Sequence, residues 1–283
     1  MKYLLVVAHP DDEVLGAGAS MYKWSLIGDK IDVCIMSAEA KARAFRPEDG
    51  ELEDDTNTST KFIGVERKFE GSFPNIEMNT VPHLKLVQFI ETAIKESEPD
   101  IVITHHPADT NNDHLQTSMA CQEAIRLFQR RPEVKRIKEF WFMEVPSCTE
   151  WKINNALNTF NPNCYVEVGR DGVDAKIRAL SMYRGVMRPY PHPRSAEYIT
   201  GLAAMRGGQW GLEYAEAFEV VLREYQLKKE RTLTTEEIKD KVARFIEVEE
   251  HSCSPILPTP ENVARLCYIT EDEAAEALKA LGR

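Results

Sequence analysis

Residues 2–36, KYLLVVAHPDDEVLGAGASMYKWSLIGDKIDVCIM, contain the order of elements that decides the fold. Residues 2–8 are a continuous apolar run, which is typical of a buried strand. Residues 13–27 have apolar side chains at helical spacing and end at Gly28, and residues 30–36 are a second apolar run. A strand, a helix and a strand in this order predict a parallel βαβ unit, and therefore an α/β fold.

The chain continues this alternation of strands and helices up to about residue 228. We predict helices at 82–97, 113–129, 172–183 and 195–207, and strands at 100–105, 138–145 and 163–168. Residues 39–58 are predicted to form a long polar loop, and residues 59–67 a short helix that Gly64 ends. Residues 213–222 fit both a strand and a helix, so their structure stays open at this stage.

The composition changes after residue 228, where a charged segment of helical period precedes a Pro-rich break and two short helical segments. We therefore predict two domains, residues 1–228 and a small helical appendage at residues 229–283. Residues 262–283 have the spacing of a helix-turn-helix, but they contain four acidic and only three basic residues. We expect the appendage to serve homo-oligomerisation or docking to a partner rather than binding to nucleic acid.

Acidic residues outnumber basic ones by 46 to 35, which gives the chain a formal net charge of −11. Such a chain is a poor general binder of nucleic acid or of an anionic membrane. The sequence has no apolar run as long as a membrane span, and its N-terminus lacks the features of a signal peptide. Six scattered cysteines without a CxxC pair predict reduced thiols, so we expect a cytoplasmic protein.

Two groups of histidine and acidic side chains directly follow predicted strands. Residues 9–13, HPDDE, come after the first strand, and residues 105–114, HHPADTNNDH, come after the strand at 100–105. In open α/β sheets, ligands bind beyond the carboxyl ends of the strands. We therefore expect the two groups to converge on one site.

Imidazole and carboxylate groups together suit zinc, and a catalytic zinc site commonly has three protein ligands and one open position. The first group supplies His9, Asp11 and Asp12, and the second supplies His114 on the first turn of its helix. One acid can then bind the metal while another acts as the general base. A purely structural role at the helix start explains one or two of the acids, but it does not explain His9 or the second group.

The two motifs resemble those of the PIG-L/LmbE-like zinc-dependent N-deacetylases. They are AHPDDE at residues 8–13 and HHPADTNNDH at residues 105–114, and a weaker third element is MYRGVMRPYPHPRSAEYI followed by RGGQWGLEYAEAF. The resemblance covers residues 1 to about 222. It implies a Rossmann-like fold, with a mostly parallel sheet flanked by helices, and hydrolysis of an acetamide, often on an N-acetylglucosamine unit.

Carried over residue by residue, the resemblance implies that His9, Asp12 and His114 bind Zn²⁺ and that Asp11 is the general base. Many members of the family have a histidine three positions before the last zinc ligand, where this chain has Asn111. An amide can donate a hydrogen bond to an oxyanion, but it cannot act as a general acid.

Other side chains are candidates for the remaining roles. His192, in PYPHPRS, is the first candidate for the partner of the oxyanion, and His105 and His106 come next. We assign His106 and Arg43 as candidates for substrate binding, since loops like the one that contains Arg43 often carry specificity. Asp113 fits either a residue that orients a neighbouring group or a helix cap.

Together with the two motifs, the resemblance implies a zinc-dependent N-deacetylase that removes the acetyl group from a small-molecule amino sugar and releases acetate. Another divalent metal is compatible with the same ligands. The alternative is a zinc amidase that acts on another amide or amino-sugar conjugate. A non-catalytic binding protein is disfavoured because none of the expected ligands is missing.

Overall fold

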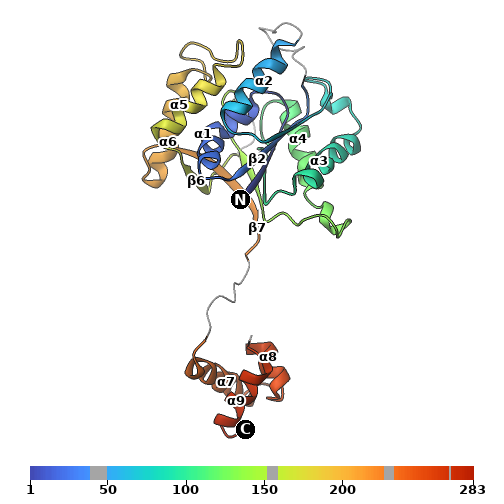
Figure 1. Ribbon diagram of the computed structural model, residues 1–283, viewed down its shortest axis with the longest axis vertical. Coiled ribbons are helices and arrows are strands. Elements are labelled where there is room, and N and C mark those ends of the chain that lie inside the picture. The colour runs from blue at the N-terminus through green and yellow to red at the C-terminus, as the bar shows by residue number, and fades with distance from the viewer. Residues whose placement is uncertain (39–49, 152–158, 226–232, 268) are drawn as a thin grey trace. The chain divides into compact units, whose positions relative to one another are not determined.

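The computed structural model describes residues 1–38, 50–151, 159–225, 233–267 and 269–283. Its contacts divide the chain into two units, Met1–Glu224 and Tyr225–Arg283 (Figure 1). Each unit has a hydrophobic core of its own. The boundary predicted between residues 228 and 229 falls outside the described residues.

The first unit is built on a seven-stranded sheet within the part of the chain that the structure describes. Its strands are β1 (Lys2–Val7), β2 (Lys30–Ile35), β3 (Arg67–Glu70), β4 (Ile101–His105), β5 (Glu139–Met143), β6 (Cys164–Glu167) and β7 (Ala215–Arg223). They lie in the order β3-β2-β1-β4-β5-β7-β6. The first five in this order are parallel, and β7 and β6 extend the sheet with antiparallel pairing. The mostly parallel sheet confirms the predicted α/β fold.

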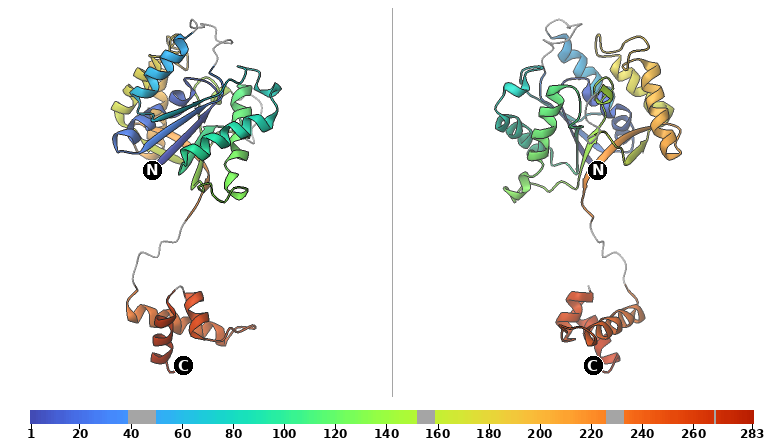
Figure 2. Two further views of the ribbon diagram at one scale, coloured as in Figure 1. Left: turned by 45° about the vertical axis from the view of Figure 1, so that its right-hand side comes forward. Right: turned by 180° about the vertical axis from the view of Figure 1, so that it is seen from behind.

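Helices cover both faces of this sheet (Figures 1 and 2). They are α1 (Asp12–Leu26), α2 (Glu51–Phe62), α3 (His83–Ser97), α4 (Asn112–Ala124), α5 (Gly169–Leu180) and α6 (Ala196–Trp210). The helices α3 and α4 lie on one face, and α1, α2, α5 and α6 lie on the other.

Strand β1 is buried on both of its sides, which explains its continuous apolar sequence. Leu5 and Val7 belong to the core on the α1 side, whereas Leu4 and Val6 belong to the core on the α3 and α4 side. Successive side chains of a strand point to opposite faces of the sheet, so one apolar run contributes to two cores.

Helix α1 is interrupted at Ala17, whose backbone is not helical (φ −142°). After this interruption, the carboxylate of Glu216 on β7 accepts the backbone N–H groups of Ala19 (3.2 Å) and Ser20 (2.7 Å). The ammonium of Lys176 on α5 lies 2.6 Å from the same carboxylate. Glu216 therefore caps the second part of α1, and its buried charge is compensated by Lys176.

The predicted polar loop at 39–58 is wrong for residues 51–58, because helix α2 begins at Glu51. This segment has no apolar helical period in its sequence because most of the buried side chains of α2 are polar. They are Leu52, Asp55, Thr56, Ser59 and Thr60. The short strand β3 was also not predicted, and residues 215–223, most of which fitted both a strand and a helix, form β7.

The described residues of the second unit form α7 (Thr235–Glu250), α8 (Pro260–Cys267) and α9 (Glu271–Ala280). Their buried side chains include Ile238, Val242, Val263, Ala274 and Leu278. Thr234 and Thr270 begin α7 and α9 with capping boxes, which satisfy the first backbone donors of each helix. Across both units, none of the described helices combines the length and the apolar character that crossing a bilayer requires.

We predict that Glu216→Leu lowers the free energy of unfolding by about 3–5 kcal/mol, because it leaves a buried ammonium and two backbone N–H groups without their acceptor. Urea unfolding followed by circular dichroism measures this loss. Glu213→Leu is the control, since Glu213 is exposed three residues earlier in the chain. Equal stability of the two variants would contradict the capping role of Glu216.

Candidate functional site

The two histidine-containing motifs lie at the point where the order of the sheet reverses. Strands β1 and β4 are parallel neighbours. The chain leaves β1 for α1 on one face and leaves β4 for α4 on the other. Such a switch point opens a crevice at the carboxyl ends of the two strands, where α/β folds commonly bind their ligands.

Asp11 forms a strained turn between β1 and α1. Its backbone is in the left-handed region (φ 92°), which residues other than glycine rarely adopt. The carboxylate of Glu13 supports the turn by accepting the backbone N–H of Asp11 (3.1 Å) and the hydroxyl of Tyr183 (2.6 Å). Burial raises the pKa of Glu13 to about 8, although the hydrogen bond from Tyr183 opposes this shift. Glu13 thus holds the turn that presents its two acidic neighbours.

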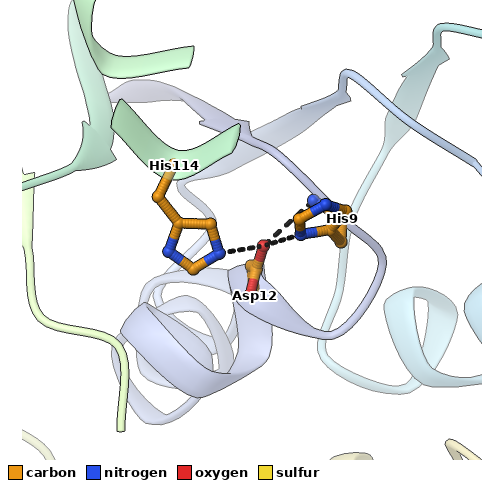
Figure 3. Close-up of side chains that lie close together, drawn as sticks. All are labelled: His9, Asp12 and His114. Carbon is orange, nitrogen blue, oxygen red and sulfur yellow. Dashed lines mark hydrogen bonds and ion pairs between the residues drawn. The ribbon is translucent and has the colours of Figure 1, made fainter. Parts of the chain in front are cut away.

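Three buried side chains from the two motifs meet around the carboxylate of Asp12 (Figure 3). Its Oδ2 lies 3.3 Å from Nδ1 of His9 and 3.2 Å from Nε2 of His114. The three possible ligand atoms lie within 4.8 Å of one another. The motifs therefore converge as expected, and they bring together the donor set of a zinc site with three protein ligands.

A second carboxylate holds the remaining ring nitrogen of each histidine. Nε2 of His9 lies 3.0 Å from Oδ2 of Asp113, and Nδ1 of His114 lies 2.9 Å from Oδ2 of Asp109. A carboxylate accepts hydrogen bonds, so each of these ring nitrogens carries a proton. The opposite nitrogens, which face Asp12, are the ones left to bind a metal.

Two roles that the sequence left open, the cap of α4 and the orientation of a neighbouring group, belong to Asn111 and Asp113. Asn111 is the cap of α4, since its side-chain oxygen accepts the backbone N–H of Asp113 (2.9 Å). The carboxylate of Asp113 instead orients His9, and it is itself held by the backbone N–H groups of Ile76 (2.5 Å) and Met78 (3.1 Å). Asp109 was not among the predicted site residues, and its position five residues before His114 carried no periodic signal.

The pKa values of His9, Asp12 and His114 are all shifted by burial and by their mutual contacts. Burial lowers the pKa of His114, but the carboxylates of Asp12 and Asp109 outweigh burial and raise it to about 10. In the same way, burial opposes the rise in the pKa of His9 that its hydrogen bonds to Asp113 and Asp12 produce. The pKa of Asp12 is held well below its usual range, because the neighbouring imidazoles overcome the cost of burial. In the metal-free cluster, the raised pKa of His114 therefore leaves a proton at neutral pH on the nitrogen that a metal would use, and the pKa of His9 is shifted in the same direction.

Arg194 is a second site residue that the sequence reasoning missed. Its Nη1 lies 3.5 Å from Oδ2 of Asp11, and its Nε donates to the hydroxyl of Ser147 (3.0 Å). His192, two residues earlier, is exposed, and its Nδ1 accepts the backbone N–H of Arg194 (3.0 Å). Desolvation and the charges of Arg194 and Arg188 lower the pKa of His192. Within the segment PYPHPRS, the arginine rather than the histidine contacts the acidic motif.

The two predicted substrate-binding residues have different outcomes. His106 is 1% exposed, and its Nδ1 accepts the backbone N–H of Ala108 while its Nε2 lies 3.4 Å from the carboxylate of Glu219. These contacts tie His106 to the interior of the fold, and its contact with a substrate stays a prediction. Arg43 lies outside the described residues.

Comparisons with known proteins give one family and one fold. The family model described as PIG-L, GlcNAc-PI de-N-acetylase, matches residues 4–125. No curated protein sequence matches the chain.

Solved structures that share the fold include three from different organisms. A conserved protein of Thermus thermophilus has a TM-score of 0.64 at 22% identity, over 81% of this chain and 99% of that one. The N,N'-diacetylchitobiose deacetylase of Pyrococcus horikoshii has a TM-score of 0.63 at 18% identity, over 78% and 84%. The 4-carboxy-2-hydroxymuconate hydratase GalB of Pseudomonas putida has a TM-score of 0.63 at 19% identity, over 81% and 99%.

A deacetylase and a hydratase both have this fold, so the fold by itself does not specify the reaction. The family match is more specific, because residues 4–125 include both motifs and therefore the group of His9, Asp12 and His114. Residues 4–125 are thus similar to the PIG-L family, which agrees with the resemblance that the two motifs indicate.

Proposed function

We propose that the protein is a metal-dependent N-deacetylase that hydrolyses the acetamide of a small-molecule amino sugar and releases acetate. The observation that carries this proposal is the buried group of His9, Asp12 and His114, directly beside Asp11. Both histidines have one nitrogen held by a carboxylate and the other turned toward Asp12. This donor set suits Zn²⁺, although other divalent ions are compatible with it.

A divalent metal at this position supplies, when bound, a lower pKa for water and a positive charge for a carbonyl oxygen. The proton transfers fall to the protein. Asp11 is 3% exposed and lies next to Asp12, so its carboxylate is suited to accept a proton from the attacking water. Asn111 cannot act as an acid, and in this proposal Asp11 also returns the proton to the leaving nitrogen.

Arg194 supports the same step. Its guanidinium lies within ion-pair distance of Asp11, and its Nε is restrained by Ser147. A fixed cation at this position orients the base, and in this proposal it also stabilises the negative charge that develops on the amide oxygen. We therefore assign to Arg194 the supporting role that the sequence suggested for His192.

The choice of an amino sugar rests on the known relatives. The matching family model is described by its de-N-acetylase activity on GlcNAc-PI, and two structural neighbours are described as deacetylases of diacetylchitobiose and of teicoplanin biosynthesis. We propose an N-acetylglucosamine-type substrate on this basis. An amidase for another amide or amino-sugar conjugate is the alternative, and a cytoplasmic location and self-association stay predictions.

Acetate release from a panel of N-acetylated amino sugars tests the reaction. The zinc-loaded wild-type protein should release acetate from at least one of them. Asp11→Asn should lower the rate about 10²–10⁴-fold, because an amide cannot take the proton, while the bound zinc is retained. Loss of zinc in this variant would show that Asp11 is a metal ligand. Absence of acetate from every N-acetyl sugar, with cleavage of another amide, would favour the alternative.

Two variants compare the candidates for stabilising the oxyanion. Arg194→Gln should lower kcat about 10²-fold, because it removes the cation beside Asp11. His192→Ala should change kcat much less, since His192 is exposed and contacts the backbone of Arg194. Steady-state kinetics of acetate release measure both effects. The reverse order of the two losses would restore His192 to the mechanism.

Zinc binding should depend steeply on pH. Because the pKa of His114 is raised to about 10 in the metal-free protein, its ring is protonated at pH 7 and must lose a proton to bind Zn²⁺. Zinc affinity should therefore rise as the pH increases from about 6 to about 9, and binding should release protons. Titration calorimetry in buffers with different ionisation enthalpies measures this release. Binding without proton release at pH 7 would contradict the assignment of His114.

A further inference from the structure

His105 is a buried histidine that the proposed mechanism does not use. It ends β4 and has no exposed surface. Its ring stacks on that of His114, with centroids 3.8 Å apart and planes 18° from parallel. On its other side, its Nε2 lies 2.8 Å from the backbone nitrogen of Ala8, the residue before His9. His105, the first residue of the second motif, thus contacts both His114 and the backbone next to His9.

The contact with Ala8 determines where the proton of His105 lies. A backbone N–H can only donate, so Nε2 of His105 must accept and carries no proton. A neutral imidazole then carries its proton on Nδ1. Nδ1 lies 3.8 Å from Oδ2 of Asp109, which is the carboxylate that holds His114. His105 is therefore neutral with its proton on Nδ1, and this nitrogen makes no hydrogen bond within the described residues.

The same argument separates two possible metal sites. His105, Asp109 and His114 also lie close enough together to hold an ion. However, both nitrogens of His105 are unsuitable as ligands, because one accepts a hydrogen bond from Ala8 and the other carries the proton. Nδ1 of His114 is likewise occupied by its hydrogen bond to Asp109. These three residues therefore support the first group rather than form a second metal site.

We propose that His105 is a positioning residue that holds the imidazoles of His9 and His114 in the orientation that metal binding requires. Its ring fixes one face of His114, and its Nε2 fixes the backbone from which His9 extends. This inference rests on the metal-dependent function proposed above. Residues that orient metal ligands from behind typically change metal affinity about 10–100-fold when they are mutated.

Two substitutions of His105 distinguish its stacking on His114 from its hydrogen bond with Ala8. His105→Gln can retain an acceptor for the N–H of Ala8 but loses the ring that stacks on His114. His105→Phe retains an aromatic ring but leaves the buried N–H of Ala8 unpaired. Each variant should bind Zn²⁺ about 10–100-fold more weakly in a chelator competition assay. The visible spectrum of bound Co²⁺ should also change, because it reports the geometry of the ligands and not the stability of the fold.

His83→Gln is the matched control, since His83 is a partly exposed histidine on α3 that pairs with Glu123 at the surface. It should retain the zinc affinity and the Co²⁺ spectrum of the wild type. Wild-type zinc affinity in both His105 variants would overturn the proposal. A wild-type protein that binds zinc but releases no acetate would overturn the deacetylase function, while weaker zinc binding by the variants would still support the role of His105.

A direct measurement does not depend on the folding of any variant. Long-range ¹H–¹⁵N correlation spectra of the ¹⁵N-labelled wild-type protein distinguish the two neutral tautomers of each histidine. His105 should appear as the tautomer with the proton on Nδ1. A proton on Nε2 is incompatible with acceptance from Ala8 and would overturn the proposal.

Discussion

The geometry of the site depends on carboxylates that place the protons of two buried histidines. Asp113 accepts a hydrogen bond from the ring N–H of His9, and Asp109 accepts one from the ring N–H of His114. Because an imidazole has only two nitrogens, this choice decides which nitrogen of His9 and of His114 faces Asp12. Without these carboxylates, either ring could present a proton where a metal needs a lone pair.

This arrangement is costly for a protein without a metal. Asp12 lies among buried acids and between two imidazoles, and the pKa values of both rings are raised because a proton compensates part of the negative charge. Burial of unbalanced charge opposes folding unless it is paired. A divalent cation inverts this local electrostatic balance, since its positive charge takes the place of the protons on the rings and attracts the carboxylates directly. The crowding of acids in HPDDE is then an advantage for binding rather than a fault.

Much of the fold could be predicted from the sequence because buried strands of a parallel sheet have continuous apolar runs. The convergence of the two motifs followed from the same reasoning, since parallel strands end at one edge. The first part of helix α2, residues 51–58, could not be predicted, because its buried side chains include Asp55 and Thr56. Arg194 and Asp109 were missed for another reason: their contacts depend on side-chain directions that sequence spacing does not contain.

Asn111 shows how a departure from the family pattern changes the division of work. Its side-chain oxygen caps α4 through the N–H of Asp113, which leaves the Asp113 carboxylate to hold His9. The amide thus supports the metal-binding geometry but provides no acidic proton. If the proposed reaction proceeds, one carboxylate must both take and return the proton, and Asp11 must stay correctly oriented in both steps. The strained turn, Glu13 and Arg194 together restrain Asp11, which is the constraint that such a mechanism requires.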